Sequence, residues 1–233
     1  MSATAVPANL ADMVRAQGKN RSSAVAYEFE GRQTTFAEFD VNTNRVANAL
    51  IALGLRKGDR IAYLGKNSDI YFELLMGAMK AGVVMAPVNW RLADPEVAFI
   101  VADCKAPALF VGPEFIAQIR NIRAQLPDVK HVITTEGGAP EWQDFSAWRG
   151  AQGGGPPGVA IGPKDVAIPL YTSGTTGKPK GAMITHRNVL GGRQAAAAAN
   201  MAWNTWGPDD ISLVAMPVAH IGGTGWGIVG LMN

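Results

Sequence analysis

The sequence predicts an α/β fold: a largely parallel sheet flanked by helices, with an incomplete second sheet region after it. Between residues 25 and 135, short runs rich in β-branched and aromatic residues alternate with segments whose apolar residues recur at helical spacing. Strands that alternate with helices of this length form parallel sheets with crossover connections. The chain has 233 residues, 48% of them apolar, which is enough for a large buried core.

The first elements are a hairpin and a capped helix. Residues 25–35 contain two β-rich runs on either side of a turn at Gly31, which is typical of a hairpin. Thr35 and Glu38 fit a capping box, in which each side chain satisfies a free backbone N–H of the other residue. The helix that starts there is expected to end at Gly54.

Strands and helices then alternate. The apolar run 83–88 has no polar alternation, as expected for a strand with both faces covered. Ser68 and Gly82 mark the start and the end of the helix before it. The expected strands span residues 60–64, 83–88, 108–111 and 129–134, and the expected helices residues 68–80, 95–103 and 113–124.

A glycine-rich stretch divides the chain. Six glycines and three prolines between Arg149 and Lys164 indicate a surface connection without regular structure. We therefore expect an α/β subdomain over 1–148, a connection over 149–164, and the start of a second subdomain over 165–233. Residues 227–233 are apolar, unlike a usual polar terminus. We expect the chain to be a truncated, N-terminal part of a longer enzyme.

Composition excludes several classes of protein. The net charge is +2 and the basic residues are scattered, so no nucleic-acid surface is expected. The single cysteine, Cys104, excludes internal disulfides and is expected to be buried.

The N-terminus lacks the pattern of a signal peptide, which favours a cytoplasmic protein. Residues 211–233 carry no charge, but Pro217 and five glycines favour a strand, a turn and a buried helix start over a transmembrane span. Peripheral membrane contact and homo-oligomerisation stay open.

Residues 171–181, Tyr-Thr-Ser-Gly-Thr-Thr-Gly-Lys-Pro-Lys-Gly, carry the clearest chemical signal. Glycines let backbone N–H groups approach an anion, hydroxyls donate hydrogen bonds, and lysines supply positive charge. This combination suits a polyphosphate. The segment is not a Walker A loop, because Gly174 and Gly177 are three apart and Pro179 stands where the hydroxyl residue should follow Lys178.

This segment resembles the phosphate loop of the acyl-adenylate-forming family, which includes acyl-CoA synthetases, peptide-synthetase adenylation domains and luciferases. Two weaker family elements precede it in the expected order, Thr-Phe-Ala-Glu-Phe at 35–39 and Lys-Ala-Gly-Val-Val-Met-Ala-Pro-Val-Asn at 80–89. The residues after the second element, 90–92, continue it as in acid–CoA ligases. The resemblance therefore covers nearly the whole chain and favours the fatty-acid–CoA ligase type.

The resemblance implies a two-step reaction with ATP, Mg²⁺ and coenzyme A. A carboxylate attacks the α-phosphorus of ATP to give an acyl-AMP, and the thiol of coenzyme A then displaces AMP. The family's magnesium-binding Glu, ribose-binding Asp and catalytic Lys have no counterpart here, so we expect no metal site in this chain and no activity from it alone. The nucleotide-binding residues implied are Thr172, Ser173, Gly174, Thr175, Thr176, Gly177, Lys178 and Lys180.

Residues 216–223 predict the class of acid. Peptide synthetases place an Asp here to pair with the substrate's amino group, whereas this segment has no carboxylate, and an unpaired ammonium would be costly to bury. The resemblance instead makes His220 the tentative catalytic residue at the acyl site, with Ala219, Gly222 and Gly223 lining the substrate pocket. The apolar residues that follow favour a hydrophobic, alkyl or aryl, acid.

Other conspicuous residues are expected to be structural. His186 is interpreted as a helix-start or surface residue, and Trp90 and Arg91 as packing residues. Two alternatives to the acid–CoA ligase remain: another adenylate-forming enzyme, such as an aryl-acid ligase or a luciferase-like protein, and a nucleotide-binding module without catalysis.

Overall fold

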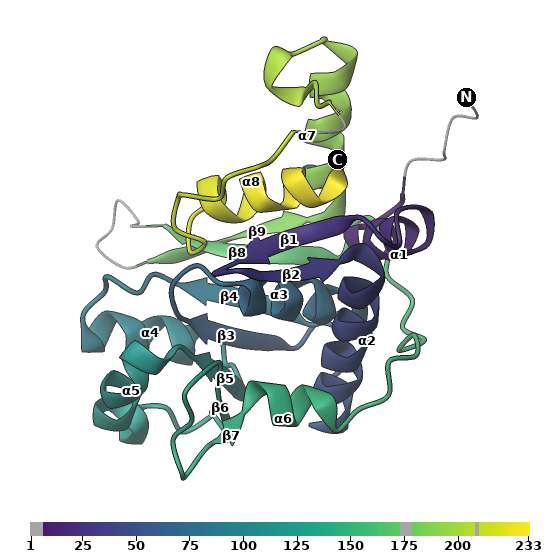
Figure 1. The fold of residues 1–233 in the computed structure, drawn as a ribbon. Coiled ribbons are helices and arrows are strands. Elements are labelled where there is room, and N and C mark those ends of the chain that lie inside the picture. Colours follow the sequence, from purple (N-terminus) through teal and green to yellow (C-terminus); the bar gives the residue numbers. More distant parts are fainter. Residues whose placement is uncertain (1–6, 173–178, 208–209) are drawn as a thin grey trace.

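The computed structural model describes residues 7–172, 179–207 and 210–233, and a five-stranded parallel sheet lies at its centre (Figure 1). The strand order is β4-β3-β5-β6-β7, and every neighbouring pair is parallel. The predicted α/β class is therefore confirmed. The strands are β3 (Arg60–Leu64), β4 (Val84–Val88), β5 (Ala108–Val111), β6 (His131–Thr134) and β7 (Gln143–Asp144).

Helices cover both faces of this sheet. Ile61 and Tyr63 of β3 face one apolar core, and Ala62 and Leu64 face a second one. This is the alternation that a strand imposes when both of its faces are buried. The first core includes helices α2 (Phe36–Ala52), α3 (Asp69–Ala81) and α6 (Phe145–Gly150), and the second includes α4 (Asp94–Asp103) and α5 (Ile116–Ile122).

The predicted caps are confirmed. Strands β1 (Val25–Phe29) and β2 (Arg32–Thr35) form the antiparallel hairpin, and Thr35 begins α2. The Thr35 hydroxyl accepts from the N–H of Glu38 at 3.3 Å, while the Glu38 carboxylate accepts from the N–H of Thr35 at 2.8 Å. At the far ends of α2 and α3, Gly54 and Gly82 have φ of +84° and +70°, the left-handed conformation that glycine adopts without strain.

Five elements differ from the sequence prediction. The helix expected over 113–124 is split into a 3₁₀ turn, α5 and a second 3₁₀ turn, and β6 starts at His131 rather than Val129. Three short or weakly periodic elements escaped the pattern: α1 (Leu10–Asn20), β7 and α6. Two residues of β7 are too few for periodicity, and α6 depends on the cap that Asp144 gives to the N–H groups of Ser146 and Ala147.

The glycine-rich connection begins later than predicted. Helix α6 extends to Gly150, because Phe145 and Trp148 are buried in the first core. The following residues to 165 form no helix or strand, but side chains of α2 hold them in place. Asn44 Nδ2 donates to the carbonyl of Gly154 at 3.0 Å, and Asn48 Nδ2 donates to those of Gly153 and Gly155 at 2.8 and 3.0 Å. The division into subdomains stays a prediction.

The region after the connection consists of one hairpin and two long helices. Strands β8 (Val166–Thr172) and β9 (Lys180–Thr185) are antiparallel, and β8 packs beside β4. Helices α7 (His186–Ala198) and α8 (Ile221–Met232) follow, and α8 lies over the hairpin in Figure 1. The strand expected after residue 210 is absent from the described residues 210–220, where backbone carbonyls bond to a side chain of the first region instead.

The N-terminal helix packs against this second region. Asn9 Nδ2 donates to the carbonyl of Ile161 at 3.0 Å, and the N–H of Leu10 donates to Nδ1 of His186 at 3.3 Å. About two turns later along α1, the Gln17 amide donates to the carbonyl of Leu231 at 3.2 Å. The start and the end of the described chain are thus adjacent in the fold.

Candidate active site

The β8–β9 hairpin brings the two ends of the predicted phosphate segment together. Thr172, the last residue of β8, is paired with Lys180, the first residue of β9. Both side chains are exposed. Ser173, Gly174, Thr175, Thr176, Gly177 and Lys178, which the sequence also assigns to the nucleotide, lie outside the described residues.

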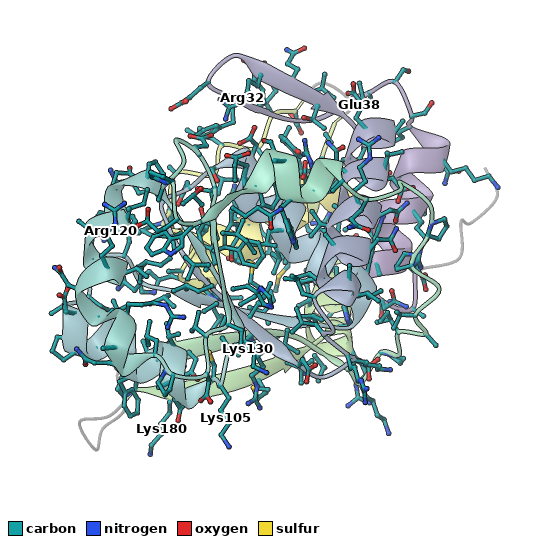
Figure 2. All side chains as sticks on the ribbon, turned by 90° about the horizontal axis from the view of Figure 1, so that it is seen from below. Arg32, Glu38, Lys105, Arg120, Lys130 and Lys180 are labelled. Atoms are coloured by element: carbon teal, nitrogen blue, oxygen red, sulfur yellow. The ribbon has the colours of Figure 1, made fainter. Side chains whose placement is uncertain are left out.

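Lys180 has a free positive charge among the described parts of the chain. Its ammonium group forms no hydrogen bond or ion pair with any of them, and the side chain extends from the margin of the molecule in the view from below (Figure 2). A lysine in this state can donate to an incoming anion without first losing another partner. This placement agrees with the role predicted for Lys180 and does not by itself test it.

Tyr171 fixes the hairpin to the first region near the end where Thr172 pairs with Lys180. Its hydroxyl donates to the carboxylate of Asp103, at the end of α4, at 2.7 Å. On the neighbouring strand, a Cβ at Gly181 would lie only 3.3 Å from the Tyr171 ring. Glycine at this position therefore lets the ring lie close to β9. Burial and the nearby Asp103 carboxylate raise the pKa of Tyr171, so the hydroxyl remains a donor.

His220 occupies the position before α8. Its carbonyl accepts from the N–H groups of Gly223 and Thr224, each at 3.1 Å, and its own N–H donates to Pro217 at 3.1 Å. The imidazole is exposed and bonds to no other described residue. In Figure 1 the first turn of α8 lies at the same end of the molecule as the junction of β8 and β9. The first turn of α8 and the ends of β8 and β9 that meet at Thr172 and Lys180 thus lie at one end of the fold.

The other predicted pocket residues surround His220. Ala219 is buried, and a Cβ at Gly223 would lie 2.3 Å from the carbonyl oxygen of Pro217. Gly223 is therefore required by the packing of the turn. A Cβ at Gly222 would lie 2.8 Å from the sulfur of Met216, a flexible neighbour that can move aside. The expectation of a buried helix start is wrong for Ile221, which is 52% exposed.

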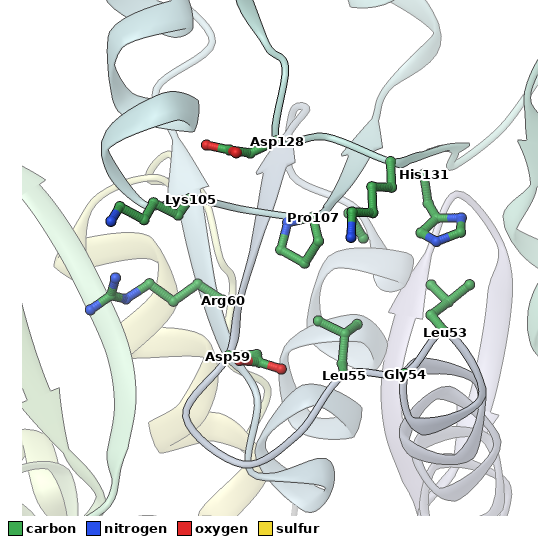
Figure 3. Close-up of a pocket in the computed structure, with 11 residues that line it drawn as sticks. Leu53, Gly54, Leu55, Asp59, Arg60, Lys105, Pro107, Asp128 and His131 are labelled. Carbon is green, nitrogen blue, oxygen red and sulfur yellow. The ribbon is translucent and has the colours of Figure 1, made fainter.

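Two cavities lie beside the parallel sheet, and none of the predicted site residues lines them. The first, of about 340 Å³, opens at the amino ends of β3, β5 and β6 (Figure 3). In this cavity Arg60 and Lys105 point away from His131, and Asp59 and Asp128 add negative charge to the wall. The second, of about 380 Å³, adjoins it at His131. Charges of both signs that do not converge give no specific anion site.

The buried titratable groups are structural. Burial lowers the pKa of His186 to about 4, so its ring is neutral at pH 7 and accepts from Leu10. His186 is confirmed as a helix-start residue, but it is buried rather than on the surface. Burial also raises the pKa of Cys104 to about 11, which keeps the thiol protonated. Desolvation lowers the pKa of Lys80 to about 8, although Asp40 and Asn44 accept from its ammonium.

Trp90 and Arg91 stack on each other. The Arg91 guanidinium lies 4.6 Å from the centre of the Trp90 ring, and Trp90 packs against the second core beside Phe115. This arrangement matches the packing role expected for both residues. Within the described ranges, no group of three or more His, Cys, Asp and Glu side chains could hold a metal ion. Nor is any helix of the described chain long and apolar enough to cross a membrane.

A parallel sheet with helices on both faces, followed by a hairpin whose strands flank a hydroxyl- and lysine-rich sequence segment, is an arrangement found in the N-terminal domains of adenylate-forming enzymes. A model of the AMP-binding enzyme family matches residues 14–233, and the chain belongs to that family. The chain is 40% identical over 198 residues to a fatty acid–[acyl-carrier-protein] ligase, ScoC, of Streptomyces coeruleorubidus, which covers 84% of this chain and 37% of that protein. An indoleacetate–CoA ligase of Aromatoleum aromaticum is 34% identical over 199 residues, 85% of this chain and 38% of the relative.

Solved structures give the same result. The inhibitor-bound N-terminal domain of FACL13 from Mycobacterium tuberculosis superposes with a TM-score of 0.81 at 30% identity, over 97% of this chain and 55% of that one. The anthranilate CoA ligase AuaEII with anthranoyl-AMP gives 0.77 at 30% identity, over 83% and 38% of the two chains. The chain thus spans less than two fifths of the length of the two curated relatives named above.

The sequence prediction did not include the residues of the parallel-sheet region that form hydrogen bonds with the candidate site. Asn67 and Tyr71, at the start of α3, bond to the segment around His220, and Asp103 bonds to Tyr171. Asn67 and Val214 are 147 positions apart, and no local pattern links them. Only Ser68, the cap of α3, gave a signal at this place, and that signal concerned the helix alone.

Proposed function

We propose that the complete protein containing this chain activates a hydrophobic carboxylic acid, foremost a fatty acid, to an acyl-AMP and then to an acyl-CoA. The observation that carries this proposal is the pairing of Thr172 with Lys180, which brings together the two ends of a polyphosphate-type sequence segment at the end of the fold where α8 begins. Membership of the AMP-binding enzyme family supports the nucleotide, and the relatives named for acid ligation support the reaction class.

The proposed chemistry has two steps. A carboxylate oxygen bonds to the α-phosphorus of ATP as the bond to pyrophosphate breaks, and a thiol sulfur then bonds to the acyl carbon as AMP leaves. The 172–180 segment would hold the β- and γ-phosphates. The free ammonium of Lys180 would offset the charge on the departing pyrophosphate, which is electrostatic stabilisation of the transition state. Mg²⁺ would supply further charge neutralisation, but the described residues offer no ligand set for it, and no step is assigned to it here.

The segment around His220 supports an apolar substrate. Residues 216–223 contain no carboxylate to pair with an amino group, so a zwitterionic amino acid would bury an unpaired ammonium. The relatives' names include a fatty acid and the aryl-substituted indoleacetate, so alkyl and aryl acids are both proposed substrates.

A second candidate differs only in the acceptor thiol. The relative from Streptomyces coeruleorubidus is named for transfer to an acyl carrier protein, in place of coenzyme A. The adenylation step is the same, so the two candidates are separated by offering each acceptor to the preformed acyl-AMP.

The test is acid-dependent exchange of pyrophosphate into ATP by the complete protein, with straight-chain, aryl and amino acids compared. For straight-chain acids, each methylene is expected to add about 0.8 kcal/mol of binding, about fourfold in affinity, until the pocket is full. Ala219→Phe should shift the preference toward smaller acids, whereas Ala195→Phe, on the exposed face of α7, should not. Preference for an α-amino acid would contradict the proposal. ATP binding without exchange for any acid would favour the non-catalytic nucleotide-binding module.

A further inference from the structure

One side chain from the first region holds the turn that carries His220. Asn67 lies between β3 and α3, and its Nδ2 donates to the carbonyls of Val214 at 3.1 Å and Met216 at 2.9 Å. Its Oδ1 accepts from the N–H of Val218 at 3.0 Å. A single amide thus uses both of its N–H groups and its carbonyl on one turn.

Tyr71 adds a second anchor one helical turn further on. Its hydroxyl is fully buried, lies 2.5 Å from that of Thr224, and lies 3.1 Å from the carbonyl of Val218. The Thr224 hydroxyl donates to the same carbonyl at 2.5 Å. Since each hydroxyl has one hydrogen, the arrangement fits a chain in which Tyr71 donates to Thr224 and Thr224 donates to Val218.

His220 lies between these two anchored points. Its imidazole has no described partner, so only the backbone of residues 218–224 sets where the ring is held. That backbone has little room to adjust, because the carbonyl of Pro217 packs closely against Gly223. A Cβ at Gly223 would lie only 2.3 Å from this carbonyl oxygen. A substitution of Asn67 or Tyr71 that shifts this backbone would therefore also shift the His220 ring.

We propose that Asn67 is a positioning residue for acid activation, which acts by holding the turn that presents His220, with Tyr71 as its support. The effect on catalysis rests on the function proposed above. The effect on the turn does not, because it follows from the hydrogen bonds alone.

The sharpest variant is Asn67→Asp. It keeps the size of the side chain and an oxygen that accepts from Val218, but it places a second carboxylate oxygen against the carbonyls of Val214 and Met216. Two attractive contacts thereby become repulsive. Asn48→Asp is a matched control, because the Asn48 amide also donates to two carbonyls, those of Gly153 and Gly155, away from His220.

The first measurement is amide hydrogen exchange of the 233-residue chain. Asn67→Asp should speed exchange in residues 214–224 and leave that of β3–β6 unchanged, while Asn48→Asp should speed exchange only around residues 153–155. Unchanged exchange at 214–224 in Asn67→Asp would overturn the inference. Tyr71→Phe, which removes only the hydroxyl, is the second variant if Asn67→Asp does not fold, and the same region should then exchange faster.

The second measurement separates positioning from a general loss of structure. In the complete protein, Asn67→Asp should lower kcat/KM for the acid about 10–100-fold, the scale of a small misplacement of a catalytic group, with KM for ATP unchanged. An equal loss in Asn48→Asp, or a rise in KM for ATP alone, would overturn the positioning role. Absence of acid-dependent activity in the unaltered protein would instead overturn the proposed function, and the exchange data would still decide whether Asn67 holds the turn.

Discussion

The parallel-sheet region and the region after residue 165 differ in how far their apolar side chains are buried and in how their backbone groups are hydrogen-bonded. Every residue of β4 is buried, and α3 is buried along nearly its whole length. In the second region, by contrast, Ile211 is 93% exposed and Leu213 is 79% exposed. The first region buries most of its apolar side chains, in a core that Ile168, Leu170 and Ile228 of the second region also enter, whereas the second region holds the candidate site on a two-stranded hairpin and one helix start.

The second region takes part of its order from the first. Asp103 accepts from Tyr171, near the end of the hairpin where Thr172 pairs with Lys180, and Asn67 holds the turn before α8. Both residues lie at or beside the ends of elements in the parallel-sheet region. The comparison therefore shows that side chains at the margins of the parallel-sheet region fix the hairpin and the turn that carry the predicted site residues.

The largest expected effect is on stability and tests the difference in burial between α3 of the first region and the segment before α8. Leu75→Ala in α3 removes a fully buried side chain and should lower the free energy of unfolding by about 2–5 kcal/mol. Leu213→Ala is the matched change at an exposed position and should alter it by less than about 0.5 kcal/mol. Urea denaturation of both variants measures the difference. Equal losses of unfolding free energy in the two variants would contradict the difference in burial between the two positions.

The next effect concerns the predicted phosphate segment. In the complete protein, Lys180→Ala should slow acyl-AMP formation by about 10–1,000-fold, the scale of losing one charge-stabilising group. The affinity for the acid should change little. Lys19→Ala removes the same charge from the exposed end of α1 and should leave the rate unaltered. Pyrophosphate exchange is the readout, and an unaltered rate in Lys180→Ala would remove the role assigned to this lysine.

The smallest effect tests the contact that joins the two regions. The pKa of His186 is about 4 in the folded chain and about 6.5 when unfolded, so the unfolded state binds more protons between these values. The stability from this group is complete above pH 6.5 and is lost as the pH falls toward 4, by up to about 3 kcal/mol. His186→Gln should remove that part of the pH dependence, measured by urea denaturation from pH 4 to 7. His131→Gln, at a partly exposed strand end, should keep it.

Sequence alone predicted most of the first region because its signals are local. Thr35 with Glu38, Ser68 and Gly82 each fix a helix end through residues close in the chain. For the second region the sequence indicated function more clearly than structure: the 171–181 motif predicted a phosphate segment, but only an incomplete second sheet region was expected around it. The strand expected after residue 210 failed because Asn67, far away in sequence, bonds to the carbonyls of Val214 and Met216. Such long-range side-chain bonds leave no periodicity to detect.

The bond between Leu10 and His186 also has a consequence for biosynthesis. The two residues are 176 positions apart, so a ribosome that adds about 5–20 residues per second completes the partner of α1 about 10–35 s after Leu10 itself. During that interval the buried side chains of Leu10 and Val14 can pack on α2 and α3, but the amide of Leu10 lacks its acceptor. The nascent parallel sheet is therefore made while the N-terminal helix still lacks the acceptor of Leu10, which α7 supplies, and the acceptor of Gln17, which α8 supplies.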